Sequence, residues 1–202
     1  MNNDELPLGQ HKINALLRWN IDHPGIVYQN PKFDPKTWIL TINGEVENPI
    51  ELSWLEFQKL PAIESMSDFH CVEGWSIKNL TWYGILFKTL IAIVKPTKDG
   101  KFVIFQCSDG YTTSLNLEDL LENNVLLVYK LNGQFLEIPI GGPLRLIVPD
   151  KYAYKSAMWV EKITFAKKKE LGFWEKRGYS DTAEVWKNDR FAERKVSLSQ
   201  AS

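Results

Sequence analysis

The chain has few of the residues that build disulfide frameworks or zinc sites. Its 202 residues include only two cysteines, Cys71 and Cys107, and three histidines. Two cysteines make no disulfide framework, and a Cys71–Cys107 bridge is disfavoured if the protein is cytoplasmic, because that compartment is reducing. No Cys/His pair has the spacing of a structural zinc site.

Net charge and long apolar runs are also missing. Lys and Arg together number 24 and Asp and Glu number 25, for a formal net charge of -1. This balance argues against a nucleic-acid partner, which needs a basic face. No run reaches the roughly 18 apolar residues of a membrane span, and the best candidate, 86–94, is broken by Lys88. The amino-terminal segment is acidic and unlike a secretory signal. We expect a cytoplasmic protein without a membrane span.

Apolar residues, by contrast, are abundant enough for a core. They make up 44% of the chain, which includes eight Trp. A chain of this length buries roughly 70% of the surface that it exposes when unfolded. We expect a single domain over residues 1–202 with polar ends.

The local patterns predict more strands than helices. Residues 38–42 alternate and lead into Asn43-Gly44, which is typical of a strand entering a turn. Ser53 and Glu56 form a capping box for a short helix that must end near Pro61, and 86–94 has helical spacing. Further strands are expected at 63–69, 102–107, 111–115, 125–129, 144–148 and 159–165. The expected fold class is α+β: a mostly β, mixed-sheet domain with short helices.

Cys71 ends the extended segment 63–69 and opens a glycine-containing loop, a common place for an active site. The residues alone leave four interpretations of its thiol. It is an inert buried cysteine, a nucleophile, a zinc ligand, or a ligand to a soft metal whose other ligands belong to a cofactor. A nucleophile lacks an obvious base, because His70 should point to the opposite face of the strand. A zinc ligand lacks protein partners.

Several ordered motifs resemble the sulfite-oxidase family of molybdopterin oxidoreductases. The first is His70-Cys-Val-Glu-Gly-Trp-Ser76 with Trp82-x-Gly84, which is similar to the metal-binding segment of methionine-sulfoxide reductase catalytic subunits. The others are Asp34-Pro-x-x-Trp38 with Gly44-x-Val46-x-x-Pro49, the runs 141–149 and 151–160, and the tail 172–179 with Trp186 and Arg190-Phe191. The tail resembles that of short cytoplasmic members. The resemblance runs from about 18 to 191, which we take as the core of a sulfite-oxidase-type molybdopterin-binding fold.

The resemblance implies that Cys71 is the one protein ligand of a molybdenum atom, which one molybdopterin binds through its dithiolene. A soft thiolate suits such a metal. It also implies that Arg145 binds the pterin phosphate, for which its bidentate guanidinium is suited. The other expected cofactor-binding residues are Trp19, Asp22, His23, Cys107, Asp109, Lys155, Ser156, Ala157 and Met158. The family's usual polar contacts are replaced here by Ile140 and Met158, and Lys155 is the candidate to compensate for Met158. For Cys107 core packing, and for Lys155 a solvent-facing position, remain open alternatives.

The residues after Cys71 bear on the reaction. Sulfite is a compact dianion that needs converging cations, whereas this loop carries Glu73 and Trp75. We therefore expect Cys71, Glu73 and Trp75 to form the catalytic centre of an enzyme that reduces a small S-oxide or N-oxide by two-electron oxygen-atom transfer. A separate electron-transfer partner would supply the electrons. The alternatives are a sulfite oxidase-like enzyme, a non-catalytic molybdopterin carrier, and an interaction module with an inert Cys71.

Overall fold

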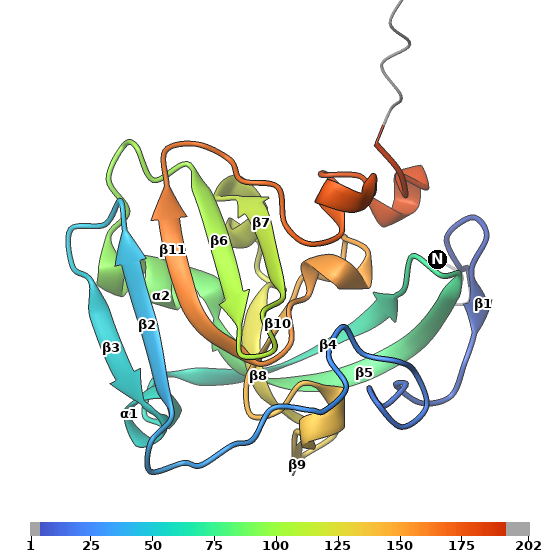
Figure 1. Cartoon of the computed structure of the whole chain (residues 1–202), viewed down its shortest axis with the longest axis horizontal. Coiled ribbons are helices and arrows are strands. Elements are labelled where there is room, and N and C mark those ends of the chain that lie inside the picture. The colour runs from blue at the N-terminus through green and yellow to red at the C-terminus, as the bar shows by residue number, and fades with distance from the viewer. Residues whose placement is uncertain (1–4, 193–202) are drawn as a thin grey trace, which may run out of the picture.

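The strands of the protein form two sheets (Figure 1) in a computed structural model that describes residues 5–192. The strands are β1 (His11–Lys12), β2 (Ile39–Gly44), β3 (Ile50–Ser53), β4 (Ala62–His70), β5 (Trp75–Leu86), β6 (Phe102–Cys107), β7 (Thr112–Asn116), β8 (Leu126–Leu131), β9 (Gln134–Phe135), β10 (Arg145–Ile147) and β11 (Val160–Ala166). One sheet has the order β3-β2-β11-β6-β7. The other has the order β1-β5-β8-β10, with β4 beside β5 and β9 beside β8. Both sheets are mixed, since β11 runs parallel to β2 and β1 parallel to β5.

The helices are short, as the sequence predicts. They are α1 (Trp54–Gln58), α2 (Phe87–Val94) and the 3₁₀ turns η1 (Glu118–Leu121), η2 (Ile138–Ile140), η3 (Ala153–Lys155), η4 (Glu175–Arg177) and η5 (Val185–Lys187). The predicted capping box is present: the Glu56 side chain accepts from the Ser53 amide at 2.9 Å, and the Ser53 hydroxyl accepts from the Glu56 amide. Helix α2 ends at Lys95, whose left-handed backbone precedes Pro96. None of the described helices is long and apolar enough to cross a membrane.

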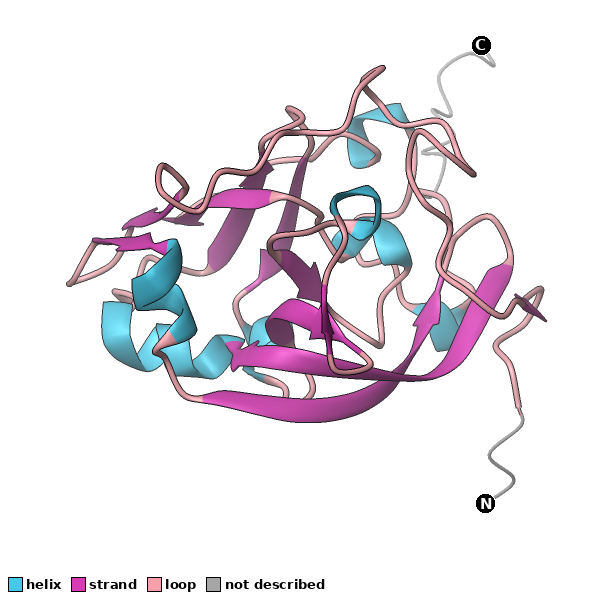
Figure 2. Ribbon diagram, turned by 90° about the horizontal axis from the view of Figure 1, so that it is seen from below, coloured by secondary structure: helices cyan, strands magenta, loops and turns pink. Residues whose placement is uncertain are grey.

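The β4–β5 hairpin is the longest element and carries the Cys71 loop at its tip. Its strands pair from Ala62–Ile85 to His70–Ser76 and curve along one side of the molecule (Figure 2). The pairing of β5 with β8 shifts at Gly84, where a Cβ atom would lie 2.2 Å from the Leu127 carbonyl oxygen. Only glycine permits this close approach of two strands.

Strand β8 is buried on both faces and separates two apolar clusters. Leu127 and Tyr129 pack in the larger cluster, which β2, β6, β11 and both α-helices complete. Leu126 and Val128 pack in the smaller one with Trp82. Burial on both faces explains why 125–129 is continuously apolar instead of alternating. Phe69 of the smaller cluster lies next to the end of β4 and also lines a cavity.

Candidate active site

A cavity of about 330 Å³ lies beside the tip of the β4–β5 hairpin. Its wall combines the amino-terminal segment, the Cys71 loop, the turn after β6, Arg145, the segment after η3, and the carboxy-terminal tail. The lining residues are Leu16, Leu17, Trp19, His23, Pro24, Gly25, Ile26, Phe69, Cys71, Val72, Glu73, Trp75, Asp109, Tyr111, Arg145, Ala153, Tyr154, Ser156, Ala157, Met158, Trp159, Trp174 and Tyr179. Aromatic side chains from distant segments therefore enclose a few polar groups, a composition typical of cofactor sites.

The Cys71 loop is a tight turn that presents the thiol to this cavity. The Cys71 amide donates to the Trp75 carbonyl at 2.8 Å, and the Gly74 amide donates to the Cys71 carbonyl at 3.0 Å. Gly74 has a φ of 103°, in the left-handed region that favours glycine. Burial, with the nearby Glu73 carboxylate, raises the pKa of the Cys71 thiol to about 12. The thiol is therefore protonated in the metal-free protein, and a bound metal would deprotonate it.

Two further side chains hold the Cys71 loop from outside the cavity. Gln10 donates from Nε2 to the Cys71 carbonyl at 3.0 Å. Arg190 donates from Nη1 to the Val72 carbonyl and from Nη2 to the Gly9 carbonyl at 3.2 Å. The amino-terminal segment, the loop and the tail are thus connected at one point.

Glu73 joins three predicted site residues. Its Oε1 lies 2.9 Å from His23 Nε2, and its Oε2 accepts from Trp75 Nε1 at 3.2 Å and lies 3.8 Å from Cys71 Sγ. Burial opposes ionisation of Glu73, but the hydrogen bonds from His23 and Trp75 outweigh it and hold the pKa of the carboxyl below its ordinary value. His23 Nδ1 lies 2.8 Å from the Pro24 carbonyl oxygen. The hydrogen bond between Nε2 and the Glu73 carboxylate carries one proton between the two side chains, beside the thiol.

Arg145 is a buried cation without a carboxylate partner among the described residues. Its side chain is 3% exposed, and the guanidinium lies over Phe69 and Trp82 at 5.0 and 5.7 Å from the ring centroids. Nη1 donates to the Ile140 carbonyl at 2.7 Å, whereas Nε has no hydrogen-bond partner in residues 5–192. Burial lowers the pKa of Arg145 to about 9. A buried cation with a free donor at a cavity wall is a site for an anion.

The replaced family contacts have a clear structural role here. Ile140 contributes its backbone carbonyl to position Arg145, and Met158 lines the cavity. Gly141 between them has a φ of 102°, and a Cβ atom there would lie 2.9 Å from Met158 Cγ and 3.2 Å from Arg145 Cδ. Gly141 thus leaves room for both side chains at the wall.

The structure brings most of the predicted site residues together. Trp19, His23, Cys71, Glu73, Trp75, Asp109, Arg145, Ser156, Ala157 and Met158 all line the cavity. The Ser156 hydroxyl oxygen accepts from the Val148 amide at 3.0 Å, which leaves its hydrogen free to donate. Burial raises the pKa of Asp109. His70 faces away from the cavity, as expected, and its Nδ1 lies 2.7 Å from the Ser76 hydroxyl oxygen.

Three predicted cofactor-binding residues are not brought to the cavity wall. Asp22 forms an exposed ion pair with Arg18 at 2.8 Å, which satisfies its carboxylate locally. Cys107 ends β6 and packs in the larger core cluster, as in the alternative considered for it.

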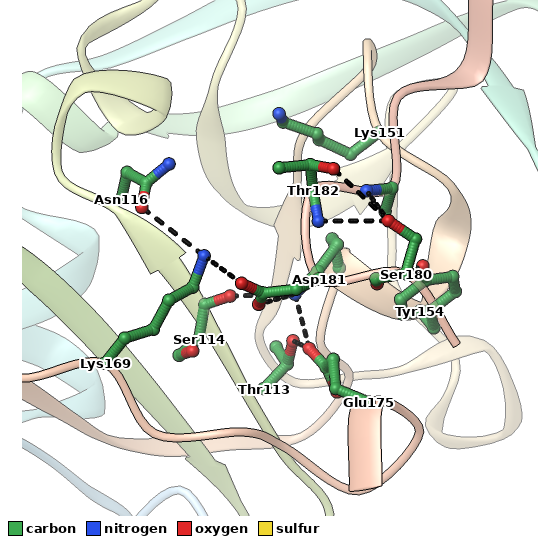
Figure 3. A network of polar contacts seen from close by, with 12 residues as sticks. Thr113, Ser114, Asn116, Lys151, Tyr154, Lys169, Glu175, Ser180, Asp181 and Thr182 are labelled. Atoms are coloured by element: carbon green, nitrogen blue, oxygen red, sulfur yellow. Dashed lines mark hydrogen bonds and ion pairs between the residues drawn. The ribbon is translucent and has the colours of Figure 1, made fainter. Parts of the chain in front are cut away.

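Lys155 is neither at the cavity wall nor facing solvent. It is fully buried, and its ammonium pairs with Glu175 and donates to the Ser114 carbonyl at 3.0 Å. Glu175 belongs to the tail and also accepts from Thr113 at 2.9 Å (Figure 3). A buried ammonium requires such a partner, and this requirement turns Lys155 away from the cavity.

Sequence reasoning missed the part of the wall that the tail and two tyrosines supply. Tyr111, Tyr154, Trp174 and Tyr179 line the cavity, and Tyr111 and Tyr154 also donate their hydroxyls to backbone carbonyls. Local spacing holds no signal for these positions. The one available hint was the motif that singled out 172–179 as part of the resemblance.

Comparisons with known proteins agree with this geometry. The profile of the family described as "Oxidoreductase molybdopterin binding domain" matches residues 27–174. The chain is 35% identical over 179 residues to the uncharacterised oxidoreductase YuiH of Bacillus subtilis, covering 88% of this chain and 89% of that protein. It is 32% identical over 160 residues to the protein-methionine-sulfoxide reductase catalytic subunit MsrP of Campylobacter jejuni, covering 71% of this chain. The match spans 54% of MsrP, about half its length.

The fold agrees as well. The sulfane dehydrogenase SoxCD of Paracoccus pantotrophus superposes with a TM-score of 0.65 at 18% identity, covering 74% of this chain and 42% of that chain. The chain therefore belongs to the sulfite-oxidase-type family of molybdopterin-binding oxidoreductases. It is an enzyme domain whose cofactor is molybdopterin with molybdenum.

The residues of the cavity fit this cofactor. A molybdenum bound to dithiolene sulfurs suits one thiolate, and Cys71 is the only cysteine in the described lining. The unpaired Nε of Arg145 suits the terminal phosphate of a pterin. The apolar and aromatic walls suit the flat ring system between these two ends.

Proposed function

We propose that Cys71 is the protein ligand of the molybdenum, that Arg145 binds the pterin phosphate, and that the enzyme reduces a neutral S-oxide or N-oxide. When bound, the cofactor supplies two-electron oxygen-atom transfer. Trp19, Ser156, Ala157 and Met158 are assigned to the walls that orient it. In the overall reaction the sulfur–oxygen or nitrogen–oxygen bond breaks, and two electrons and two protons convert the oxygen to water.

The observation that carries the choice of substrate is the carboxylate beside the thiol. Glu73 lies 3.8 Å from Cys71 Sγ with its pKa held low. Arg145, assigned to the cofactor, is the only Lys or Arg in the described lining. A sulfite dianion would meet a carboxylate and no converging cations, which is unfavourable. A neutral oxide escapes this repulsion.

The same contacts assign Glu73 and His23 a proton-holding role. The pair shares a proton between Oε1 and Nε2 at 2.9 Å, and reduction of an oxide consumes two protons. Trp75 fixes the other carboxylate oxygen through its indole N–H. The pair is thus positioned to supply a proton at the cavity wall next to Cys71.

The test compares oxide reduction with sulfite oxidation by the molybdenum-loaded protein. Dimethyl sulfoxide, methionine sulfoxide and trimethylamine N-oxide are assayed with reduced methyl viologen, and sulfite is assayed with ferricyanide. We expect turnover of at least one oxide and none of sulfite. Efficient sulfite oxidation would overturn the substrate choice, and loaded protein inactive with every substrate would favour a carrier.

A matched pair of variants tests the role of Glu73. Glu73→Gln replaces the carboxylate that accepts the shared proton with a neutral amide of the same shape, and we expect oxide reduction to fall about 100-fold, the lower range for acid–base catalysis. Glu64→Gln, an exposed residue on β4, is the control and should match the parent. An unchanged rate in Glu73→Gln would leave Glu73 with a purely structural role.

A further inference from the structure

Trp186 is a large apolar side chain that remains exposed close to the proposed metal ligand. It lies on η5 in the tail and keeps 57% of its surface exposed. Its ring contacts the ring of His70 edge to face, with 6.2 Å between centroids. His70 directly precedes Cys71 in the chain. One aromatic contact and one peptide link therefore separate the surface from Cys71.

The inner end of this connection is firmly held. His70 is buried, and its Nδ1 lies 2.7 Å from the Ser76 hydroxyl oxygen. Ser76 donates to Gln10 Oε1 at 2.9 Å, and Gln10 Nε2 donates to the Cys71 carbonyl at 3.0 Å. His70 is thus linked to Cys71 both through the backbone and through a hydrogen-bonded chain. Such a fixed, bonded route favours electron transfer over a gap through solvent.

Trp186 lines a second cavity, which we call the Trp186 hollow, with a volume of about 370 Å³. Its lining is Glu118, Asp119, Glu122, Val125, Val148, Pro149, Asp150, Lys151, Glu184, Trp186 and Lys187. Five carboxylates and two lysines give it a formal charge of −3. Lys151 pairs with Asp119 at 3.3 Å and Lys187 pairs with Glu184, so both cations are already neutralised.

The Trp186 hollow and the cofactor cavity have no lining residue in common. The residues that would receive a docked protein in the hollow are therefore distinct from those that line the cofactor cavity. Trp is also one of the residue types most enriched among interface hot spots. The charge of the hollow selects a partner with a basic face.

We propose that the Trp186 hollow is the docking site of a small, basic, one-electron carrier protein, and that the Trp186–His70 contact conducts its electrons to the Cys71 centre. The inference rests on the proposed function, because an oxide reductase needs two electrons for each turnover. Two reduced carriers dock in succession, each is oxidised by one electron, and the two electrons leave with the oxygen as water.

The experiment uses mitochondrial cytochrome c as the probe, since it is a small basic haem protein. Holoenzyme is reduced with dithionite, freed of excess reductant and mixed with ferricytochrome c, and haem reduction is followed by stopped flow. Binding of the same probe is measured by calorimetry at low and high salt. We expect Trp186→Leu to slow haem reduction and to weaken binding about thirtyfold, the smallest loss that defines a hot-spot residue. Trp186→Phe, which keeps an aromatic ring, should retain more of both.

Matched controls separate this site from general effects. Phe135→Leu removes another exposed aromatic side chain, on β9, and should behave like the parent. The double variant Glu118→Gln/Glu122→Gln should bind the probe more weakly and with a smaller dependence on salt. The control double variant Glu47→Gln/Glu51→Gln changes two exposed acids outside the hollow and should change neither the affinity nor its salt dependence. Every variant is checked for molybdenum content and melting temperature.

Three results would overturn the docking site. Trp186→Leu and Phe135→Leu could give equal rates and affinities, or the two acidic pairs could behave alike. Alternatively, gel filtration with light scattering could show a parent dimer that Trp186→Leu dissociates, which would assign the hollow to a second copy of the chain. Failure of the proposed function is distinguishable: the protein would then lack molybdenum or oxide turnover, while the binding measurements would still decide the docking.

Discussion

Replacing Arg145 with Met should stabilise the metal-free protein and weaken its hold on the cofactor. Arg145 is 3% exposed, its Nε has no partner in residues 5–192, and no carboxylate pairs with it there. The Ile140 carbonyl and two aromatic rings compensate the charge only in part. Met keeps much of the apolar stem without the charge.

The expected magnitude follows from the displaced pKa. A pKa of about 9 in place of 12.5 corresponds to an unfavourable ~5 kcal/mol for the charged form in the folded state. Replacing buried ion pairs with apolar side chains gains about 1–4 kcal/mol in measured cases, and for this single buried charge we expect the lower half of that range. A domain of this size gains roughly 2–4 °C in melting temperature for each kcal/mol.

The assay is differential scanning fluorimetry of metal-free parent and Arg145→Met, with cofactor content measured after gel filtration of loaded protein. We expect a higher melting temperature for the metal-free variant together with loss of most of its cofactor. Arg145→Lys is the control, since it keeps a charge without the planar fork. A metal-free variant less stable than the parent, or one that retains cofactor fully, would refute the assignment of Arg145 to an anion.

Burial lowers the pKa of Arg145 below its value in the unfolded chain, so the charged side chain destabilises the metal-free protein fully below pH 9 and less as the pH rises through about 9. The difference in melting temperature between the parent and Arg145→Met should therefore narrow above pH 9. A constant difference up to pH 11 would contradict this. Lys155→Met leaves the Glu175 carboxylate buried without its cation and should lower the unfolding free energy by about 3–5 kcal/mol. The double variant Lys155→Met/Glu175→Gln should restore part of this loss. Both variants are measured by chemical denaturation, and equal stabilities of the single and double variants would contradict the prediction. Protein produced in a host that makes molybdopterin should carry about one molybdenum per chain by elemental analysis. Folded protein that lacks molybdenum although the host supplies the cofactor would contradict that stoichiometry.

The parts of the fold that depend on local patterns were predictable from the sequence. The Ser53–Glu56 capping box fixes the start of α1, and the apolar run of β8 reflects burial on both faces. Cys71 directly follows β4, as the extended segment before it indicates. Each of these features could be predicted from a short stretch of neighbouring residues.

The rest depends on contacts between distant segments. Lys155 turns inward because Glu175 in the tail pairs with it, and the spacing around Lys155 holds no sign of that partner. Gln10 and Arg190 reach the Cys71 loop from positions 61 and 118 residues away. Asp22 is the exception, because its partner Arg18 is close in the sequence, at the i,i+4 spacing.

The number of sulfur ligands at the molybdenum, measured by X-ray absorption at the metal edge, shows whether Cys71 binds the metal. The measurement compares loaded parent, Cys71→Ser and Cys107→Ser. A serine hydroxyl stays protonated near neutral pH and binds such a centre poorly, while Arg145 should still retain cofactor. We expect the loss of one sulfur ligand in Cys71→Ser and none in Cys107→Ser, whose parent side chain lies in the core. Loss in Cys107→Ser instead, or in neither variant, would contradict the assignment of Cys71 as the metal ligand.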